Sequence, residues 1–402
     1  MPKIELLRET GLVSRSAFAN IVSISNVFVW YSFAFSILKG FVYELASVIW
    51  GVHFLGAAFS AIAGAAISDK ISRKTHFLLV WMMFGIISSL ILIFVDPENK
   101  LNVVAMAILL GISFGIGIPT SMGQLAYCAA VEDRAKIGGL TIFVYGLGAF
   151  FLGIIAVDDI TLQALTLAIW RAIGLIIFLL VNHSQNVEKR KSVSFRFIFN
   201  QRSFCFYFIP WTMFSLVNYL GGVIAFQILN ESTVNLFIII ENVLIGTFAI
   251  VAGFLADTFG RKRITIIGFV MLGLGYAVLG IYPENLVGWY FYTIVDGVAW
   301  GIFWVIFIIT IWGDLSYGMS EDKYYAIGGL PFYMSNFLRI LIGPYIAKVI
   351  SVYAMFSFAA FFLFLAVIPL MFAPETLPEK KLRERELRQY VEKARKIKEK
   401  FT

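Results

Sequence analysis

The chain has 402 residues, of which 60% are hydrophobic and only 14% are charged. Soluble domains carry about 25% charged residues, so this composition excludes an ordinary soluble protein and indicates a membrane protein. The formal net charge is +7, but the Lys and Arg residues lie in short loops and in the last part of the chain. That distribution is typical of membrane topology, and we expect no nucleic-acid partner.

Twelve apolar stretches are long enough to cross a bilayer, whose hydrocarbon core of about 30 Å requires roughly 20 helical residues. They lie at 20–42, 46–68, 75–95, 101–128, 137–157, 161–182, 203–229, 235–256, 263–282, 286–313, 325–348 and 353–373. The sequence therefore predicts an all-α membrane protein with twelve transmembrane helices.

The basic residues predict how these helices are oriented. All but five of the 32 Lys and Arg residues fall on one side of the membrane if successive loops alternate between the two sides; the five are Lys39, Lys100, Arg171, Arg339 and Lys348. The positive-inside bias then predicts a multi-pass protein of the cell membrane with cytoplasmic N- and C-termini. The first apolar run lacks a small-residue cleavage site, so we expect it to be a helix that directs insertion and not a cleaved signal peptide.

Three sequence motifs occur twice, in the same order. "AAISDKISRKT" from position 65 is matched by "GFLADTFGRKR" from position 253, and "EDRAKIGGL" at 132–140 is matched by "EDKYYAIGGL" at 321–330. "GISFG" at 111–115 is matched by "GVAWG" at 297–301. These repeats predict two six-helix halves in parallel, related by pseudo-symmetry about an axis along the membrane normal. The predicted boundaries are an N-terminal half at 1–182, a cytoplasmic linker at 183–202, a C-terminal half at 203–374 and a basic amphipathic tail at 375–402.

At these motifs the chain resembles the major facilitator superfamily of secondary transporters, over essentially its whole length. The family signature Gly-x-Leu-Ala-Asp-x-x-Gly-Arg-Lys is matched at every position of the second copy: Gly253, Leu255, Ala256, Asp257, Gly260, Arg261 and Lys262. The first copy keeps only Asp69, Arg73 and Lys74, so looser helix packing is expected there. Glu132 and Arg134 resemble a second family signature, and "PET" at 374–376 resembles the end of sugar-porter members.

Asp69 and Asp257 call for an explanation, because a helix C-terminus is a poor place for an anion. The resemblance implies that the loop after the second helix meets the eleventh helix, and that the loop after the eighth meets the fifth. Gly138 and Gly139 open the fifth helix, and Gly328 and Gly329 open the eleventh; such openings expose backbone N–H groups to an anion. We interpret the two aspartates as cytoplasmic latches between the halves. Simple turn chemistry is the alternative.

Charged residues inside the membrane mark function by default. Glu241, Asp296 and Arg339 lie about 24, 27 and 21 Å from the cytoplasmic loops at 1.5 Å per residue, and His53 occupies the position that the repeat relates to Glu241. We predict that these four residues face one cavity, with Tyr292 and Trp300 on the face of Asp296. Asp296 is assigned the proton and Glu241 the pairing with Arg339. The alternatives are a structural pair for Arg339, an interfacial Glu241 and a core His53.

These features together predict a secondary active transporter that moves a small solute by alternating access, with proton coupling and as a monomer. No cofactor and no metal site are expected, and the partners are the solute, protons and membrane lipid. A lipid or amphiphile flippase on the same fold is one alternative. A polytopic membrane enzyme of lipid-linked glycosyl transfer is another, but the short outer loops leave no room for a soluble substrate domain.

Overall fold

The computed structural model describes residues 14–40, 46–155, 159–181, 190–316 and 318–377. The first part of the described chain is helical: α2 (Arg15–Gly40), α3 (Ala46–Ser68), α4 (Lys74–Ile91), η1 (Leu92–Phe94), α5 (Lys100–Gly115), α6 (Ile118–Cys128), η2 (Val131–Asp133), α7 (Arg134–Ile155) and α8 (Ile160–Val181). The second part is α9 (Phe195–Phe199), α10 (Arg202–Val217), α11 (Leu220–Ile228), α12 (Glu231–Phe259), α13 (Arg261–Ile281), α14 (Leu286–Phe303), the π-helical η3 (Trp304–Thr310), α15 (Ile311–Ser316), α16 (Glu321–Gly328), α17 (Leu330–Leu341), α18 (Gly343–Val349) and α19 (Val352–Phe372).

Within these residues, eleven helical segments are long and apolar enough to cross a membrane. They coincide with eleven of the twelve predicted stretches, which confirms an all-α multi-pass membrane protein. The stretch predicted at 325–348 is instead divided into α16, α17 and α18. Pro331 and Pro344 each follow one of the two breaks, and proline cannot donate the hydrogen bond that would continue the preceding helix.

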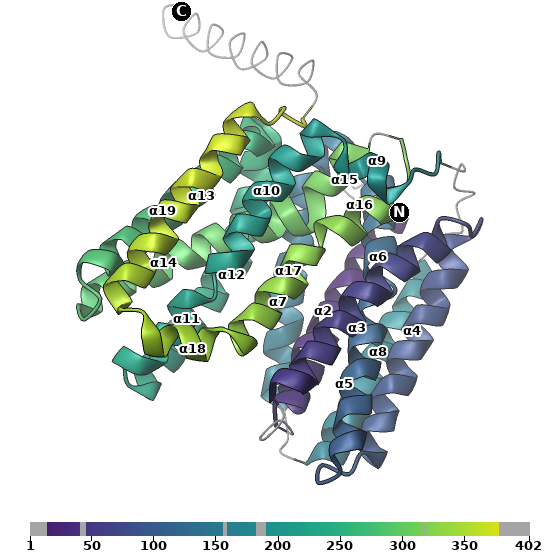
Figure 1. Ribbon diagram of the computed structural model, residues 1–402. Helices are drawn as coiled ribbons and strands as arrows, with labels where there is room; N and C mark the ends of the chain where they lie inside the picture. Colours follow the sequence, from purple (N-terminus) through teal and green to yellow (C-terminus); the bar gives the residue numbers. More distant parts are fainter. Residues whose placement is uncertain (1–13, 41–45, 156–158, 182–189, 317, 378–402) are drawn as a thin grey trace, which may run out of the picture.

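The helices form two groups that lie side by side, α2 to α8 and α10 to α19 (Figure 1). Two pairs of helices join the groups: α7 packs against α12, and α3 packs against α17. α16 also contacts α3 and α6, and η3 contacts α7. The domain boundaries at 183–202 and 375 stay a prediction.

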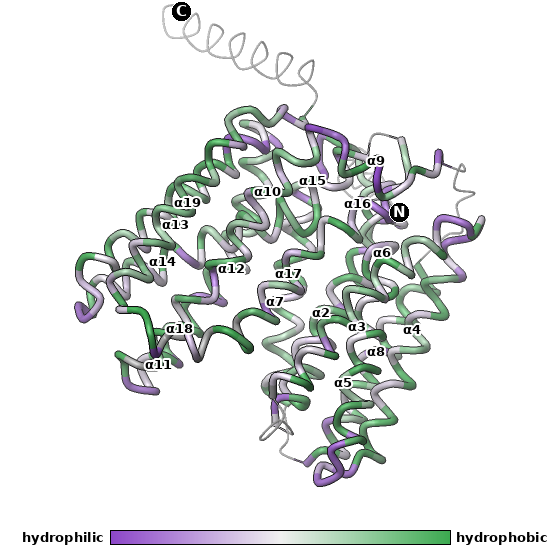
Figure 2. Tube along the Cα trace, in the orientation of Figure 1, coloured by the Kyte–Doolittle hydropathy of each residue, from purple (hydrophilic) through white to green (hydrophobic). Residues whose placement is uncertain are grey.

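The polar ends of the molecule differ from its apolar sides. Outward-facing helices such as α4, α8 and α19 are strongly hydrophobic, and hydrophilic residues gather at the helix ends (Figure 2). We call the end that carries α9, α15, α16 and the turns after α3 and α12 the signature end. The opposite end carries α11 and α18 (Figure 1).

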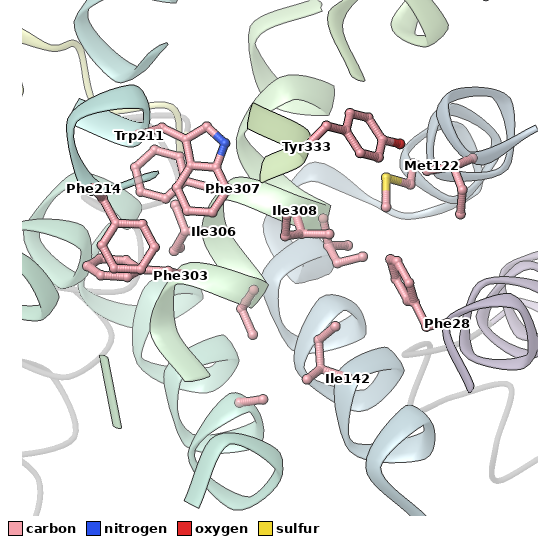
Figure 3. Close-up of a cluster of buried hydrophobic side chains, with 14 of the residues drawn as sticks. Phe28, Met122, Ile142, Trp211, Phe214, Phe303, Ile306, Phe307, Ile308 and Tyr333 are labelled. Carbon is pink, nitrogen blue, oxygen red and sulfur yellow. The ribbon is translucent and has the colours of Figure 1, made fainter. Parts of the chain in front are cut away.

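Buried aromatic and aliphatic side chains fill the space within and between the two groups. Trp211, Phe303 and Phe307 pack together inside the second group, whereas Phe28 and Tyr333 come from opposite groups and line the same space between them (Figure 3). This continuous core fixes the helices that carry the polar residues described next.

Candidate functional site

The second signature copy binds the N-terminus of a helix in the other group. Asp257, which is fully buried near the end of α12, accepts hydrogen bonds from the backbone amides of Ala135 at 3.3 Å and Lys136 at 2.8 Å. These amides open α7, where the helix dipole is positive and attracts an anion. The expected meeting of Asp257 with this helix N-terminus is present. The amides are those of Ala135 and Lys136, however, and not of Gly138 and Gly139 as predicted.

Gly139 and Gly253 serve close helix packing instead. A Cβ atom at Gly253 would lie 2.4 Å from the carbonyl oxygen of Ala135, and one at Gly139 would lie 2.4 Å from that of Ala249. Such distances are far inside van der Waals contact, so glycine at both positions lets α7 and α12 touch through their backbones. This contact brings Asp257 within reach of the α7 amides.

Two arginines and two aspartates extend the Asp257 contact into a buried network. Arg261 lies 3.0 Å from Asp257 and 2.7 Å from Asp314, and Arg134 pairs with the other oxygen of Asp314. Arg261 also donates to the backbone carbonyl of Val131. All four charged residues are nearly inaccessible to solvent, and their formal charges cancel. Asp314 was not among the sequence-predicted site residues.

Glu375 caps the N-terminus of the helix that follows the second signature. Its carboxylate accepts hydrogen bonds from the backbone amides of Arg261 at 2.9 Å and Lys262 at 3.1 Å. Gly260 makes this approach possible: its φ of 103° is in the left-handed region, and a Cβ atom there would lie 2.5 Å from the Glu375 carboxylate. Thr376 donates to Asp314 at 2.9 Å. The "PET" segment is therefore part of the buried network.

The first signature copy makes different contacts. Asp69 pairs with Lys323 of α16 at 2.6 Å and accepts a hydrogen bond from Ser192. Burial opposes its ionisation, but the hydrogen bonds from Lys323, Ser192 and Ser320 and the charge of Lys323 hold the pKa of Asp69 below its ordinary value. The predicted approach of Asp69 to the backbone at Gly328 is wrong, because Asp69 binds side chains.

An acid from the other group sits against the end of α3. Asp322 of α16 accepts hydrogen bonds from Ser68 at 2.7 Å and from Lys74 at 2.8 Å. Burial raises the pKa of Asp322, and the Lys74 charge and hydrogen bond act in the opposite direction. Arg73 is exposed, and Glu132 is partly buried beside the start of α7.

The segment 190–194 crosses the signature end and binds both groups. Arg190 pairs with Glu321 at 2.5 Å and lies over the ring of Tyr127, 4.7 Å from its centroid. The backbone carbonyl of Lys191 accepts a hydrogen bond from the backbone amide of Ser320 at 3.1 Å. The sequence interpretation treated these residues as a linker and missed their contacts, since an extended segment has no periodic signal.

A cavity of about 590 Å³ lies in the second group, on the side of α11. It is lined by polar and aromatic residues of α11, α12, α14, η3 and α17 and of the turn before α11, among them Asn218, Glu241, Asn242, Trp289, Tyr292, Asp296, Trp300, Trp304, Phe332, Ser335 and Asn336. Four of the predicted coupling residues are thus brought together: Glu241, Asp296, Tyr292 and Trp300.

Tyr292 connects the cavity to the break between α10 and α11. Its hydroxyl donates to that of Tyr276 at 3.2 Å, and Tyr276 donates to the carbonyl of Asn218 at 3.2 Å. A Cβ atom at Gly221 would lie 2.3 Å from the Tyr292 hydroxyl oxygen. Glycine at this position therefore lets the tyrosine sit against the start of α11.

The structure separates His53 from the acids. His53 is buried in the first group, where its two ring nitrogens lie 2.9 Å from the Tyr31 hydroxyl and 2.8 Å from the Ala107 carbonyl. It does not line the acidic cavity, so the expectation that it faces the same cavity as Glu241 is wrong. Arg339 lies in α17, but its side chain is outside the described residues, and its pairing with Glu241 stays a prediction.

Arg171 is buried among aromatic rings in the first group. Its guanidinium lies 5.0 Å from the ring centroid of Trp81 and 5.6 Å from that of Trp30, and it donates to the Asn26 side-chain carbonyl at 3.0 Å. These contacts join α2, α4 and α8, which gives Arg171 a packing role.

An aromatic layer separates the cavity from the signature end. Trp304 and Phe332, at the floor of the cavity, pack against each other with ring centroids 6.0 Å apart. Trp304 also contacts Phe28 at 5.4 Å and stacks on Tyr145 at 5.7 Å, both from the first group. The two groups are therefore closed against each other between the cavity and the ion pairs.

The comparisons with known proteins agree with this architecture. The family model described as Major Facilitator Superfamily matches residues 197–400, which is about half of the chain. The chain belongs to the major facilitator superfamily. Members of this superfamily are transporters, so the chain is a membrane transporter and not an enzyme. A search of curated protein sequences found no significant match.

Three solved structures share this fold over most of their length. The proton:xylose symporter XylE, bound to 6-bromo-6-deoxy-D-glucose, has a TM-score of 0.67 at 15% identity, over 91% of this chain and 97% of that chain. The human organic anion transporter MFSD10 has a TM-score of 0.68 at 14% identity, over 89% and 99%. The E. coli fucose:proton symporter FucP has a TM-score of 0.67 at 10% identity, over 89% and 98%.

Proposed function

We propose that this superfamily member carries a small solute across the cell membrane by alternating access, with proton coupling and with both termini in the cytoplasm. The observation that carries the proposal is the position of the cavity. It contains two carboxylates, and an aromatic layer separates it from the two sets of ion pairs at the signature end. Because the basic loops lie at the signature end, the proposal identifies this arrangement as a state closed toward the cytoplasm.

The ion pairs at the signature end suit a reversible closure. Asp257 and Asp69 each bind the opposite group, through backbone amides in one case and through Lys323 in the other. Charge–dipole contacts contribute about 0.3–2 kcal/mol each, and a few kcal/mol is enough to bias a two-state equilibrium. In the proposed cycle these contacts form in the outward-facing state and break in the inward-facing state.

The two acids supply the proposed route for coupling. Glu241 and Asp296 line one cavity and interact electrostatically, and two carboxylates in a site of low dielectric repel each other when both are ionised. Uptake of one proton relieves that repulsion. We assign the proton to Asp296, which lies beside Tyr292 in the lining of the cavity. We assign the pairing with Arg339 to Glu241.

Solute-driven proton movement tests this function. Purified protein is first screened by thermal shift against sugars, amino acids, organic acids and organic amines, because a ligand that binds the folded state raises its melting temperature. The best solute is then added to proteoliposomes that contain a pH-sensitive dye. We expect wild-type protein to move protons when it moves the solute, and Asp296→Asn to retain solute exchange at saturating solute without proton movement. Proton movement that persists in Asp296→Asn would remove Asp296 from the coupling mechanism.

A further inference from the structure

We propose that the solute bound in the cavity is a monovalent organic cation with an aromatic or bulky apolar group. This inference rests on the proposed function, because it names the substrate class of the same site. It is argued from three properties of the lining: charge, aromatic surface and the orientation of the amide side chains.

The cavity lining is acidic. Glu241 of α12 and Asp296 of α14 both line it. The sequences of α11, α12, α14 and η3 contain no Lys, Arg or His, and Arg339 is the one basic residue of α17. The helices around the cavity therefore bring two carboxylates to its level against at most one guanidinium. A positively charged solute restores the balance that an anion would worsen.

Aromatic rings line the same space. Trp289, Tyr292, Trp300 and Trp304 come from the successive turns of α14 and η3, and Phe332 lies across from them on α17. The face of such a ring carries partial negative charge and attracts a cation within about 6 Å, most strongly for tryptophan. A site that combines carboxylates with several indole rings is complementary to an ammonium group attached to apolar carbon.

The amide side chains add acceptors. The nitrogens of Asn242 and Asn336 donate to the backbone carbonyls of Ile238 at 2.8 Å and Phe332 at 3.1 Å. Each amide nitrogen uses one of its two N–H groups within its own helix, so each side chain keeps a carbonyl oxygen and one N–H. The carbonyl oxygens can accept hydrogen bonds from an ammonium ion.

Three probes with the same phenyl ring and different charge test the inference. Benzyltrimethylammonium, benzyl alcohol and benzoate are titrated into the full chain in lipid nanodiscs, and binding is measured by calorimetry and by tryptophan fluorescence. We expect benzyltrimethylammonium to bind at least about 10-fold more tightly than benzyl alcohol, as cation–π contacts and charge attraction to carboxylates at a desolvated site allow. Benzoate is expected to bind most weakly.

Variants connect the preference to the cavity. Asp296→Asn and Glu241→Gln each remove a negative charge and should each weaken benzyltrimethylammonium binding by about 10-fold, and Trp300→Leu should reduce the preference for the cation over benzyl alcohol. Glu284→Gln is the matched control, since Glu284 is an exposed acid in the turn between α13 and α14 at the same end of the molecule. Equal or tighter binding of benzoate or benzyl alcohol would overturn the inference, as would acid variants that bind the cation like wild type.

The outcomes separate the substrate class from the transport mechanism. If benzyltrimethylammonium binds as expected but its exchange across proteoliposomes is insensitive to a pH gradient, the substrate class stands and proton coupling fails. If a neutral solute moves protons while the cation does not bind, the coupling stands and the substrate class fails.

Discussion

The two copies of the signature motif differ in how deeply their charged residues are buried. Around the second copy, Asp257, Arg261, Asp314 and Arg134 form a network that solvent hardly reaches. Around the first copy, Asp69 is partly buried and Arg73 is exposed. The difference shows that the same aspartate and arginine can act as a buried electrostatic core or as a peripheral contact, depending on the glycines beside them.

Two substitutions in the first copy account for this difference. Gly253, which lets α12 touch α7 through the backbone, is replaced by Ala65 in the repeat. Gly260, whose positive φ admits the Glu375 carboxylate, is replaced by Ser72. Among the described residues, α13 is capped by Glu375 from a distant part of the chain, whereas Arg73, the N-cap residue of α4, makes no side-chain cap hydrogen bond.

The largest difference between the copies is expected for their arginines. Arg261→Ala leaves Asp257 and Asp314 with fewer counter-charges in a buried site, and breaking such a pair costs about 3–5 kcal/mol. Arg73→Ala changes an exposed residue and should stay within about 0.5 kcal/mol of wild type. Thermal unfolding in detergent measures both variants. If Arg73→Ala proves as destabilising as Arg261→Ala, the two copies are equivalent in energy and the comparison fails.

A smaller difference is expected for the aspartates. Asp257→Asn weakens charge-assisted hydrogen bonds to the α7 amides and should cost the closed state about 1–3 kcal/mol. Asp69→Asn removes one ion pair whose side chains are 8% and 11% exposed, and should cost less, about 1 kcal/mol. Both should raise the population open at the signature end, Asp257→Asn more strongly. Cysteine accessibility at positions on the signature-end side of Trp304 reports this population. Unchanged labelling in the double variant would contradict a latch role for both aspartates.

The sequence predicts those parts of this machinery that depend on local pattern. Helix positions follow from the length of apolar runs, and the contact of Asp257 with a helix N-terminus follows from the unfavourable position of an acid at a helix end. The interruption of the eleventh span at Pro331 and Pro344 was visible in the sequence, but a hydropathy count does not register it. Local sequence pattern thus predicts the positions of the helices better than the contacts between residues far apart in the sequence.

The network residues that the sequence did not predict are not marked by any local sequence pattern. Asp314 and Glu375 act on Arg261 from 53 and 114 positions away, and only the fold brings them together. The error at His53 has another cause: pseudo-symmetry relates backbone positions and not environments. His53 and Glu241 are equivalent in the repeat, yet His53 binds Tyr31 and Ala107 inside its own group.

Two truncated chains measure how much the Glu375 cap stabilises α13. A chain that ends after Thr376 keeps the Glu375 cap on α13, whereas a chain that ends after Ala373 loses it. Helix caps contribute about 0.5–2 kcal/mol, so the shorter chain should unfold at a lower temperature than the longer one, with Glu375→Gln in between. We expect the longer chain to keep a folded bundle. Identical melting temperatures for the two truncations would show that the cap contributes nothing.

The smallest expected effect is that of salt concentration on the Asp69 and Asp257 contacts, which differ in solvent access. Because its pKa is held below the ordinary value, Asp69 is ionised at pH 7, and the side chains of its pair with Lys323 are 8% and 11% exposed, against 0% for Asp257 and Arg261. The Debye length falls from about 10 Å at 0.1 M to about 3 Å at 1 M, so high salt should weaken this pair in wild type and shrink the effect of Asp69→Asn on labelling. Ions do not reach Asp257 in the buried network, and the effect of Asp257→Asn should persist at 1 M salt. Labelling of both variants at the two salt concentrations makes the measurement, with wild type at each concentration as the reference. A salt-sensitive Asp257 contact, or a salt-resistant Asp69 contact, would mean that burial does not distinguish the two copies.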